Sequence, residues 1–107
     1  MQSLTAETFD AARERSINEN RPMVVDFWGT WCGPCRAMVP ILELLEKEYI
    51  EVDFYCVDVF LQSQLASKWM VETVPKILVM SNGMVVQVFG ACSRDELAAK
   101  LDEILDN

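Results

Sequence analysis

Two cysteines separated by two residues, Cys32 and Cys35, are the side chains of this sequence best suited to chemistry. The spacing brings two sulfur atoms within bonding reach across a single turn. The residues before the pair are typical of a strand and those after it of a helix, so we expect Cys32 to lie at a helix N-terminus. Unpaired backbone N–H groups and the helix dipole there favour a thiolate over a thiol. A thiolate beside a second thiol can form and break disulfides by exchange.

The position of each sulfur predicts a different role. Cys32 comes first and follows Trp31, so it should be the partly exposed nucleophile. Cys35 lies one turn inside the expected helix, so it should be more buried and should resolve the mixed disulfide that Cys32 forms with a substrate. Pro34 suits the first helical turn, where its missing N–H would have no partner.

A structural or metal-binding pair is the alternative interpretation. The other two cysteines, Cys56 and Cys92, are far apart in the sequence, whereas a zinc ribbon needs a second close pair. The chain has no histidine, which excludes Cys–His catalysis and every zinc site that includes histidine. We therefore expect no bound metal, and proton transfer must rely on a carboxylate, a lysine, a second thiol or water.

Composition narrows the class of protein. A length of 107 residues fits one domain spanning residues 1–107, and an apolar content of 51% is enough for a core without disulfide staples. The net charge of −8 argues against non-specific binding to nucleic acid or to an anionic membrane, because both need a basic patch. The first residues lack the basic start and apolar run of a signal peptide, and no stretch approaches transmembrane length. We therefore expect a cytoplasmic protein. Because the cytoplasm is reducing, a disulfide there should form and be reduced repeatedly rather than persist as a structural link.

Segments whose apolar residues have helical spacing alternate along the chain with segments typical of strands, and this order predicts an α/β fold. A strand–helix–strand crossover makes the first two strands parallel, and an Asn-Gly turn at residues 82–83 makes the last two an antiparallel hairpin. The cysteine pair then follows a central strand at its carboxyl end, where open α/β sheets usually bind ligands. The expected elements are a helix capped by Thr5 and running to Asn18, a strand at 23–28, a helix after the cysteine pair, a strand at 52–59, a short helix with Leu61, Leu65 and Trp69 on one face, strands at 76–80 and 84–89, and a helix opened by a capping box at Ser93.

The run from Phe27 to Cys35, Phe-Trp-Gly-Thr-Trp-Cys-Gly-Pro-Cys, resembles the active-site motif of the thioredoxin family. The similarity extends over nearly the whole chain. It implies the thioredoxin fold, a central mixed β-sheet flanked by helices on both faces. The Gly-Pro pair between the cysteines resembles the reductase branch of that fold. Further positions that match the family are Asp26, Pro40, Val74, Pro75, Asn82, Gly83 and Gly90.

The resemblance implies a protein-disulfide reductase that works by dithiol–disulfide exchange through Cys32 and Cys35. Its partners would be disulfide-containing target proteins and a thioredoxin reductase, which passes on electrons from NADPH through its own flavin. The chain itself would bind no cofactor and would be a monomer. Two alternatives stay open. A thioredoxin-fold binding module would not need two reactive thiols, and a specialised oxidant or isomerase would differ in its reduction potential.

Asp26 lies within an apolar strand, where a carboxylate is costly unless it is paired or protonated. Burial should raise its pKa to a range in which it could exchange a proton with Cys35. The alternative is a carboxylate near the strand end that faces solvent. By resemblance, Asp26 matches the buried acid of the family, which favours the catalytic interpretation.

The resemblance also implies a substrate groove beside the cysteine pair. The sequence alone favours a trans Val74–Pro75 bond, but this position matches the cis-proline of the family. The backbone of Val74 would pair with an extended substrate segment. The other substrate contacts implied are an apolar surface from Trp31, Gly33 and Pro34, joined by Trp28 unless that side chain packs in the core, and a second wall from Gly90 and Ala91.

Three residues depart from the family's pattern. Many members have a lysine near the buried acid where this chain has Cys56, so the pKa of Asp26 should be higher still unless Lys76 reaches it. Lys76 replaces a small polar residue, and it could favour acidic substrates, lower a thiol pKa or point to solvent. Cys56 is expected to be inert packing, and Cys92 either a small apolar filler or an accessory redox thiol.

Overall fold

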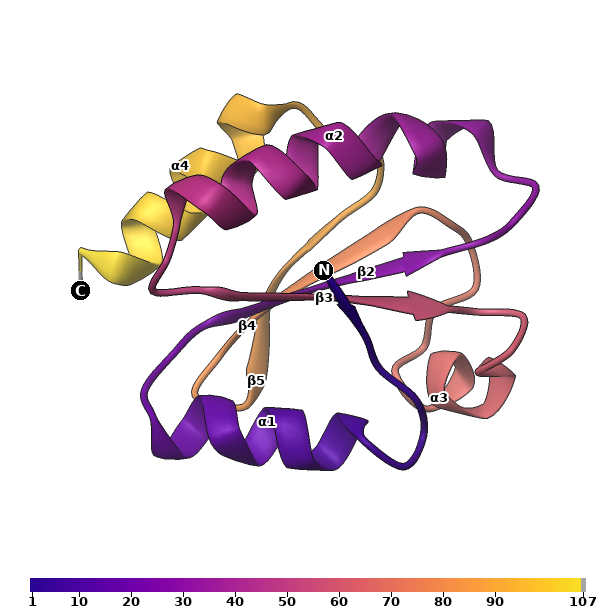
Figure 1. Ribbon diagram of the computed structural model, residues 1–107, viewed down its shortest axis with the longest axis horizontal. Helices are drawn as coiled ribbons and strands as arrows, with labels where there is room; N and C mark the ends of the chain where they lie inside the picture. Colours follow the sequence, from indigo (N-terminus) through magenta and orange to yellow (C-terminus); the bar gives the residue numbers. More distant parts are fainter. Residues whose placement is uncertain (107) are drawn as a thin grey trace.

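Within residues 1–106, which the computed structural model describes, five strands form one mixed sheet with four helices on its two faces (Figure 1). This arrangement confirms the predicted α/β fold class. The strands are β1 (Gln2–Ser3), β2 (Met23–Trp28), β3 (Asp53–Asp58), β4 (Lys76–Ser81) and β5 (Met84–Phe89). The helices are α1 (Phe9–Asn18), α2 (Gly33–Glu48), α3 (Ser63–Lys68) and α4 (Arg94–Leu105).

The order of the strands brings several chain segments to one edge of the sheet. The order is β1-β3-β2-β4-β5, with β1 and β2 parallel to β3, β4 antiparallel to β2, and β5 antiparallel to β4. Strands β2, β3 and β5 therefore end at the edge where β4 begins. Helix α2 also begins there, directly after β2 (Figure 1). We call this edge the active-site edge.

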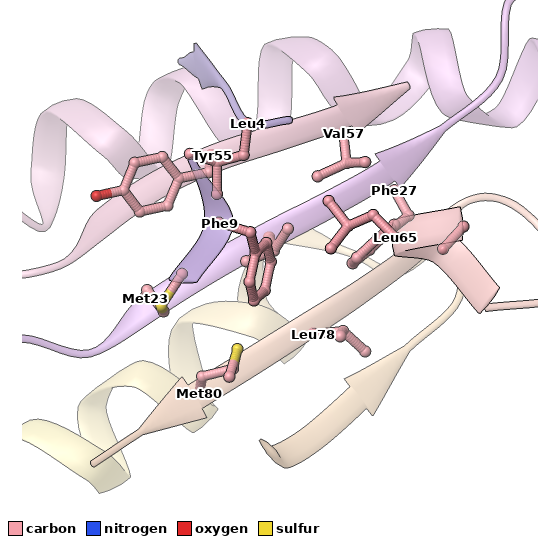
Figure 2. Close-up of a cluster of buried hydrophobic side chains, with 11 residues drawn as sticks. Leu4, Phe9, Met23, Phe27, Tyr55, Val57, Leu65, Leu78 and Met80 are labelled. Carbon is pink, nitrogen blue, oxygen red and sulfur yellow. The ribbon is translucent and has the colours of Figure 1, made fainter. Parts of the chain in front are cut away.

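Alternating side chains of the central strands fill two apolar layers. Helices α1 and α3 cover one face of the sheet, and α2 and α4 cover the other (Figure 1). In the first layer, Phe9 of α1 and Leu65 of α3 lie over the sheet (Figure 2). In the second layer, Val24 of β2 packs with Met38 and Leu42 of α2. Asp26 follows Val24 by two residues, so it points toward α2, the helix that begins at the cysteine pair.

Two local predictions are confirmed. The hairpin turn between β4 and β5 places both Asn82 (φ 54°) and Gly83 (φ 78°) in the left-handed region, as an Asn-Gly turn requires. At the start of α4, Ser93 Oγ accepts the Glu96 N–H at 3.1 Å, and Glu96 Oε1 accepts the Ser93 N–H at 3.1 Å. These two bonds form the expected capping box.

Three details differ from the prediction. Helix α1 begins at Phe9, because the Thr5 N–H and hydroxyl bond to Thr8 Oγ1 in a local turn before the helix. Leu61 does not lie on the inner face of a helix; it precedes α3 and is 73% exposed. Strand β1 was not expected, since its two exposed residues, paired with Tyr55 and Cys56 of β3, have no apolar pattern.

Candidate active site

The cysteine pair lies at the N-terminus of α2. Cys32 is the N-cap residue, with extended backbone angles, and its Sγ is joined to Cys35 Sγ in a disulfide with the Cα atoms 5.2 Å apart. The Cys35 N–H also points at Cys32 Sγ, at an N–S distance of 3.1 Å. After reduction, the same N–H and the helix dipole would stabilise a thiolate on Cys32.

The two sulfur-bearing residues differ in access. Cys35 is 2% exposed, whereas Cys32 is half-buried and so can be reached from solvent. Trp31 is almost fully exposed and does not cover the pair, and Gly33 and Pro34 are exposed as well. An approaching disulfide can therefore meet Cys32 before it can meet Cys35.

Asp26 lies behind the pair, within β2, and is 1% exposed. Its Oδ1 is buried without a hydrogen-bond partner among the described residues. Loss of hydration on burial raises the pKa of Asp26 to about 6. The alternative of a solvent-facing carboxylate is therefore wrong. Lys76 forms no ion pair within residues 1–106, so it does not offset this rise.

A cavity of about 440 Å³ connects the buried acid with the buried sulfur. Asp26, Cys35 and Cys56 all line it. Cys56 is the pairing partner of Asp26 on the adjacent strand β3, so both side chains point toward the same face of the sheet. Cys56 is half-buried and its Sγ lies 3.4 Å from Ser3 Oγ. It is thus a wall of this cavity rather than the sealed packing residue that its strand suggested.

A second hollow, which we call the front groove, has a volume of about 480 Å³. It is lined by Gly29, Thr30, Trp31, Cys32, Phe60 and Val74. The Val74–Pro75 bond that precedes β4 is cis, as the family resemblance implied. Phe60 was not predicted to lie here. The only signal in the sequence was an apolar pair, Phe60-Leu61, directly after the end of a strand.

Three other residues singled out in the sequence line neither the cavity behind the cysteine pair nor the front groove. Gly90 and Ala91 are exposed and directly follow β5, so they lie at the active-site edge but outside the lining of the front groove. Cys92 is half-buried against the apolar layer under α2 and α4. Burial, and to a lesser degree the charges of Glu96 and Asp26, raise the pKa of its thiol.

Comparison with known proteins identifies the family. The sequence model of the Thioredoxin family matches residues 1–103. The chain belongs to the thioredoxin family. It is 40% identical over 88 residues to Thioredoxin-1 of Saccharomyces cerevisiae, covering 81% of this chain and 82% of the yeast protein. It is 39% identical over 89 residues to Thioredoxin C-2 of Corynebacterium nephridii, with the same two coverages.

Solved thioredoxin structures match the fold. The Fasciola hepatica thioredoxin superposes with a TM-score of 0.83 at 35% identity, covering 96% of this chain and 98% of that one. The thioredoxin NaTrxh of Nicotiana alata superposes with a TM-score of 0.88 at 30% identity, covering 95% and 90%. Thioredoxin family membership and the bonded Cys32–Cys35 pair identify this chain as a protein-disulfide oxidoreductase.

Residues 1–106 hold neither a membrane-spanning helix nor a cluster of metal-ligating side chains. No helix in that part of the chain is long and apolar enough to cross a membrane. No group of three or more cysteine and carboxylate side chains there is close enough to hold a metal ion.

Proposed function

We propose that this thioredoxin family member reduces disulfides in target proteins. The observation that supports the proposal is the unequal access to a bonded pair, in which half-buried Cys32 caps a helix and Cys35 is enclosed behind it. The bonded pair corresponds to the end of one catalytic cycle, after the target has been reduced.

Reduction would take place in two exchanges. The Cys32 thiolate attacks one sulfur of the target disulfide, which breaks the target's S–S bond and releases its other sulfur as a thiolate. The sulfur of Cys35 then loses its proton and attacks Cys32 Sγ. This second exchange breaks the mixed disulfide, releases the second target thiol and forms the Cys32–Cys35 bond. The target gains two electrons and the pair loses two.

Asp26 is proposed to accept the Cys35 proton in the second exchange. Both residues line the cavity behind the pair, and a carboxyl group with a pKa of about 6 can be ionised at neutral pH without becoming a strong base. The cavity has room for water between them, so the proton need not pass directly.

Target binding is proposed at the front groove and along the active-site edge. Val74 lines the groove beside Cys32, where its backbone could pair with an extended target segment. Exposed Trp31, together with Gly33 and Pro34, would give the apolar contact surface. Other proposed contacts come from Pro75, Gly90 and Ala91.

Regeneration of the dithiol is proposed to come from a flavin-containing thioredoxin reductase that uses NADPH. We also propose that residues 1–107 form one domain that acts as a monomer in the cytoplasm. Two free cysteines, Cys56 and Cys92, support a reducing compartment. The relatives include proteins named as chloroplastic and mitochondrial, so the compartment needs a direct test by localisation of the tagged protein.

The test is NADPH-coupled reduction of insulin disulfides, with and without added thioredoxin reductase. Wild type should turn over only with the reductase, and Cys32→Ser should be inactive. Cys35→Ser should accumulate a mixed disulfide between Cys32 and insulin, detectable by mass spectrometry. Cys92→Ser is the matched control, because its thiol is free and outside the pair, and it should retain activity. Mixed disulfides through Cys92 alone would refute the proposal.

A further inference from the structure

Two aromatic side chains from different loops line the front groove. Trp31 follows β2 and is 95% exposed, and Phe60 follows β3 and is 83% exposed. Neither contributes its ring to the core, so folding does not account for two large apolar side chains at one hollow. Exposed aromatic residues that gather at a groove are typical of binding surfaces.

The backbone at Phe60 is fixed by an aspartate. Asp58 Oδ1 accepts the Phe60 N–H at 2.9 Å and the Leu61 N–H at 3.1 Å. The Val59 N–H donates to the Trp28 carbonyl at 3.0 Å, which ties this loop to the end of β2. These bonds hold the Phe60 backbone in place before a target binds. A target therefore does not have to order this segment in order to contact the Phe60 ring.

The same turn directs its two apolar side chains to different places. Phe60 lines the front groove with Cys32. Leu61 lines another hollow, together with Ala6, Glu7 and residues 62–65. Leu61 is similarly exposed, at 73% compared with 83%, so the pair offers an internal comparison between an apolar side chain in the groove and one outside it.

Because Cys32 lines the front groove, the ligand that binds there is the target with which Cys32 reacts. Under the proposed function, Cys32 forms a mixed disulfide with the target, so the chain on either side of the target cysteine must lie over this groove. The six lining residues carry no charged side chain. A charged neighbour of the target cysteine would lose hydration there without gaining an oppositely charged partner among these six residues, whereas an apolar one would be favoured.

We propose that Phe60 is a specificity-determining residue, which together with Trp31 selects target disulfides whose cysteine has a bulky apolar neighbour. This inference rests on the proposed function and adds a substrate class to it. Seating one such side chain between the target backbone and the ring should raise the rate constant for exchange by about tenfold over a small polar side chain.

The experiment uses two symmetric substrates and no partner enzyme. Each substrate is a disulfide-linked dimer of a single-cysteine hexapeptide, with leucine on both sides of the cysteine in one and serine in the other. Both sulfurs of a dimer have the same neighbours, so either point of attack tests the same contact. The pre-reduced full chain is mixed with each dimer, and the second-order rate constant of a single turnover is measured.

Wild type should reduce the leucine dimer about tenfold faster than the serine dimer. Phe60→Ser should lower that preference to about twofold, because the leucine dimer loses its apolar contact and is slowed more than the serine dimer. Hydroxyethyl disulfide, which has no side chains beside its sulfurs, gives the reactivity of each variant without this contact. Leu61→Ser, the matched control, should keep the full preference. Since Phe60 is 83% exposed, its replacement should leave the thermal unfolding midpoint nearly unchanged.

The proposal is overturned if Phe60→Ser retains the leucine preference or if Leu61→Ser loses it equally. Failure of the proposed function gives a different result, since wild type would then reduce neither peptide dimer nor hydroxyethyl disulfide. Equal rates of wild type with the two dimers would refute the selectivity and leave the reductase activity standing.

Discussion

Replacement of Asp26 by asparagine should make the free energy of unfolding depend less on pH. Burial raises the pKa of Asp26 from the ordinary 3.8 to about 6. One pKa unit corresponds to about 1.4 kcal/mol. The ionised side chain therefore lowers the free energy of unfolding by about 3 kcal/mol relative to its protonated form. Asparagine keeps the size and polarity of aspartate but cannot ionise.

The sign follows from which state binds the proton more tightly. Below pH 3.8 the Asp26 carboxyl is protonated in both the folded and the unfolded chain, so its ionisation does not affect stability. Between pH 3.8 and about 6 the unfolded chain loses this proton first, and the wild type is progressively destabilised. Above about pH 6 the folded chain loses the proton as well, and the effect levels off. Relative to Asp26→Asn, wild type should lose about half of the 3 kcal/mol by pH 5 and nearly all of it by pH 8.

Equilibrium unfolding in guanidinium chloride measures this difference. The oxidised forms of wild type and Asp26→Asn are compared at half-unit steps from pH 4 to 8, so that other titrating groups cancel between the two proteins. Glu72→Gln removes an exposed carboxylate and is the matched control; its stability should follow that of wild type at every pH. A difference between wild type and Asp26→Asn that stays constant across this range would refute the raised pKa of Asp26.

Two further predictions concern stability alone. Gly83→Ala should lower the free energy of unfolding by about 1–2 kcal/mol, because φ is +78° and the new Cβ would lie 2.6 Å from Ile17 Cδ1. Gly90→Ala, where an added Cβ meets no atom within 4 Å, is its near-neutral control in the same guanidinium chloride titration. Ser93→Ala removes the cap of α4 and should cost about 1 kcal/mol by the same measurement. An unchanged midpoint would show that the capping box adds nothing.

The centre of the fold is predictable because local and tertiary requirements agree there. Met23–Trp28 is a nearly continuous apolar run and forms a central strand covered on both faces. The turn at Asn82-Gly83 and the cap at Ser93 depend on a few adjacent residues, so their chemistry fixes the local structure. The Cys32–Cys35 pair is similar, because its spacing alone brings the sulfurs together.

The features that were not predicted depend on contacts between distant segments or on a competing side chain. Leu61 and Leu65 have helical spacing, but Asp58 binds the Phe60 and Leu61 N–H groups before the helix begins. Cys56 looked enclosed because its strand is apolar; its place in the wall of a cavity depends on how α2 lies over β3. The position of Phe60 beside Cys32 likewise arises only when β2 and β3 end at the same edge.

The stability that the fold loses when Asp26 ionises supports the role proposed for this residue. Its neighbours Val25 and Phe27 are fully buried, and an apolar residue at this position would fit the same strand without the penalty of about 3 kcal/mol that ionisation brings. A penalty of this size is a large fraction of the stability of a small domain. Among the described residues, Asp26 has no ion-pair partner that would offset this penalty. A buried carboxylate that destabilises the fold, shares a cavity with Cys35 and titrates near neutral pH is therefore better explained by proton transfer at the disulfide than by packing.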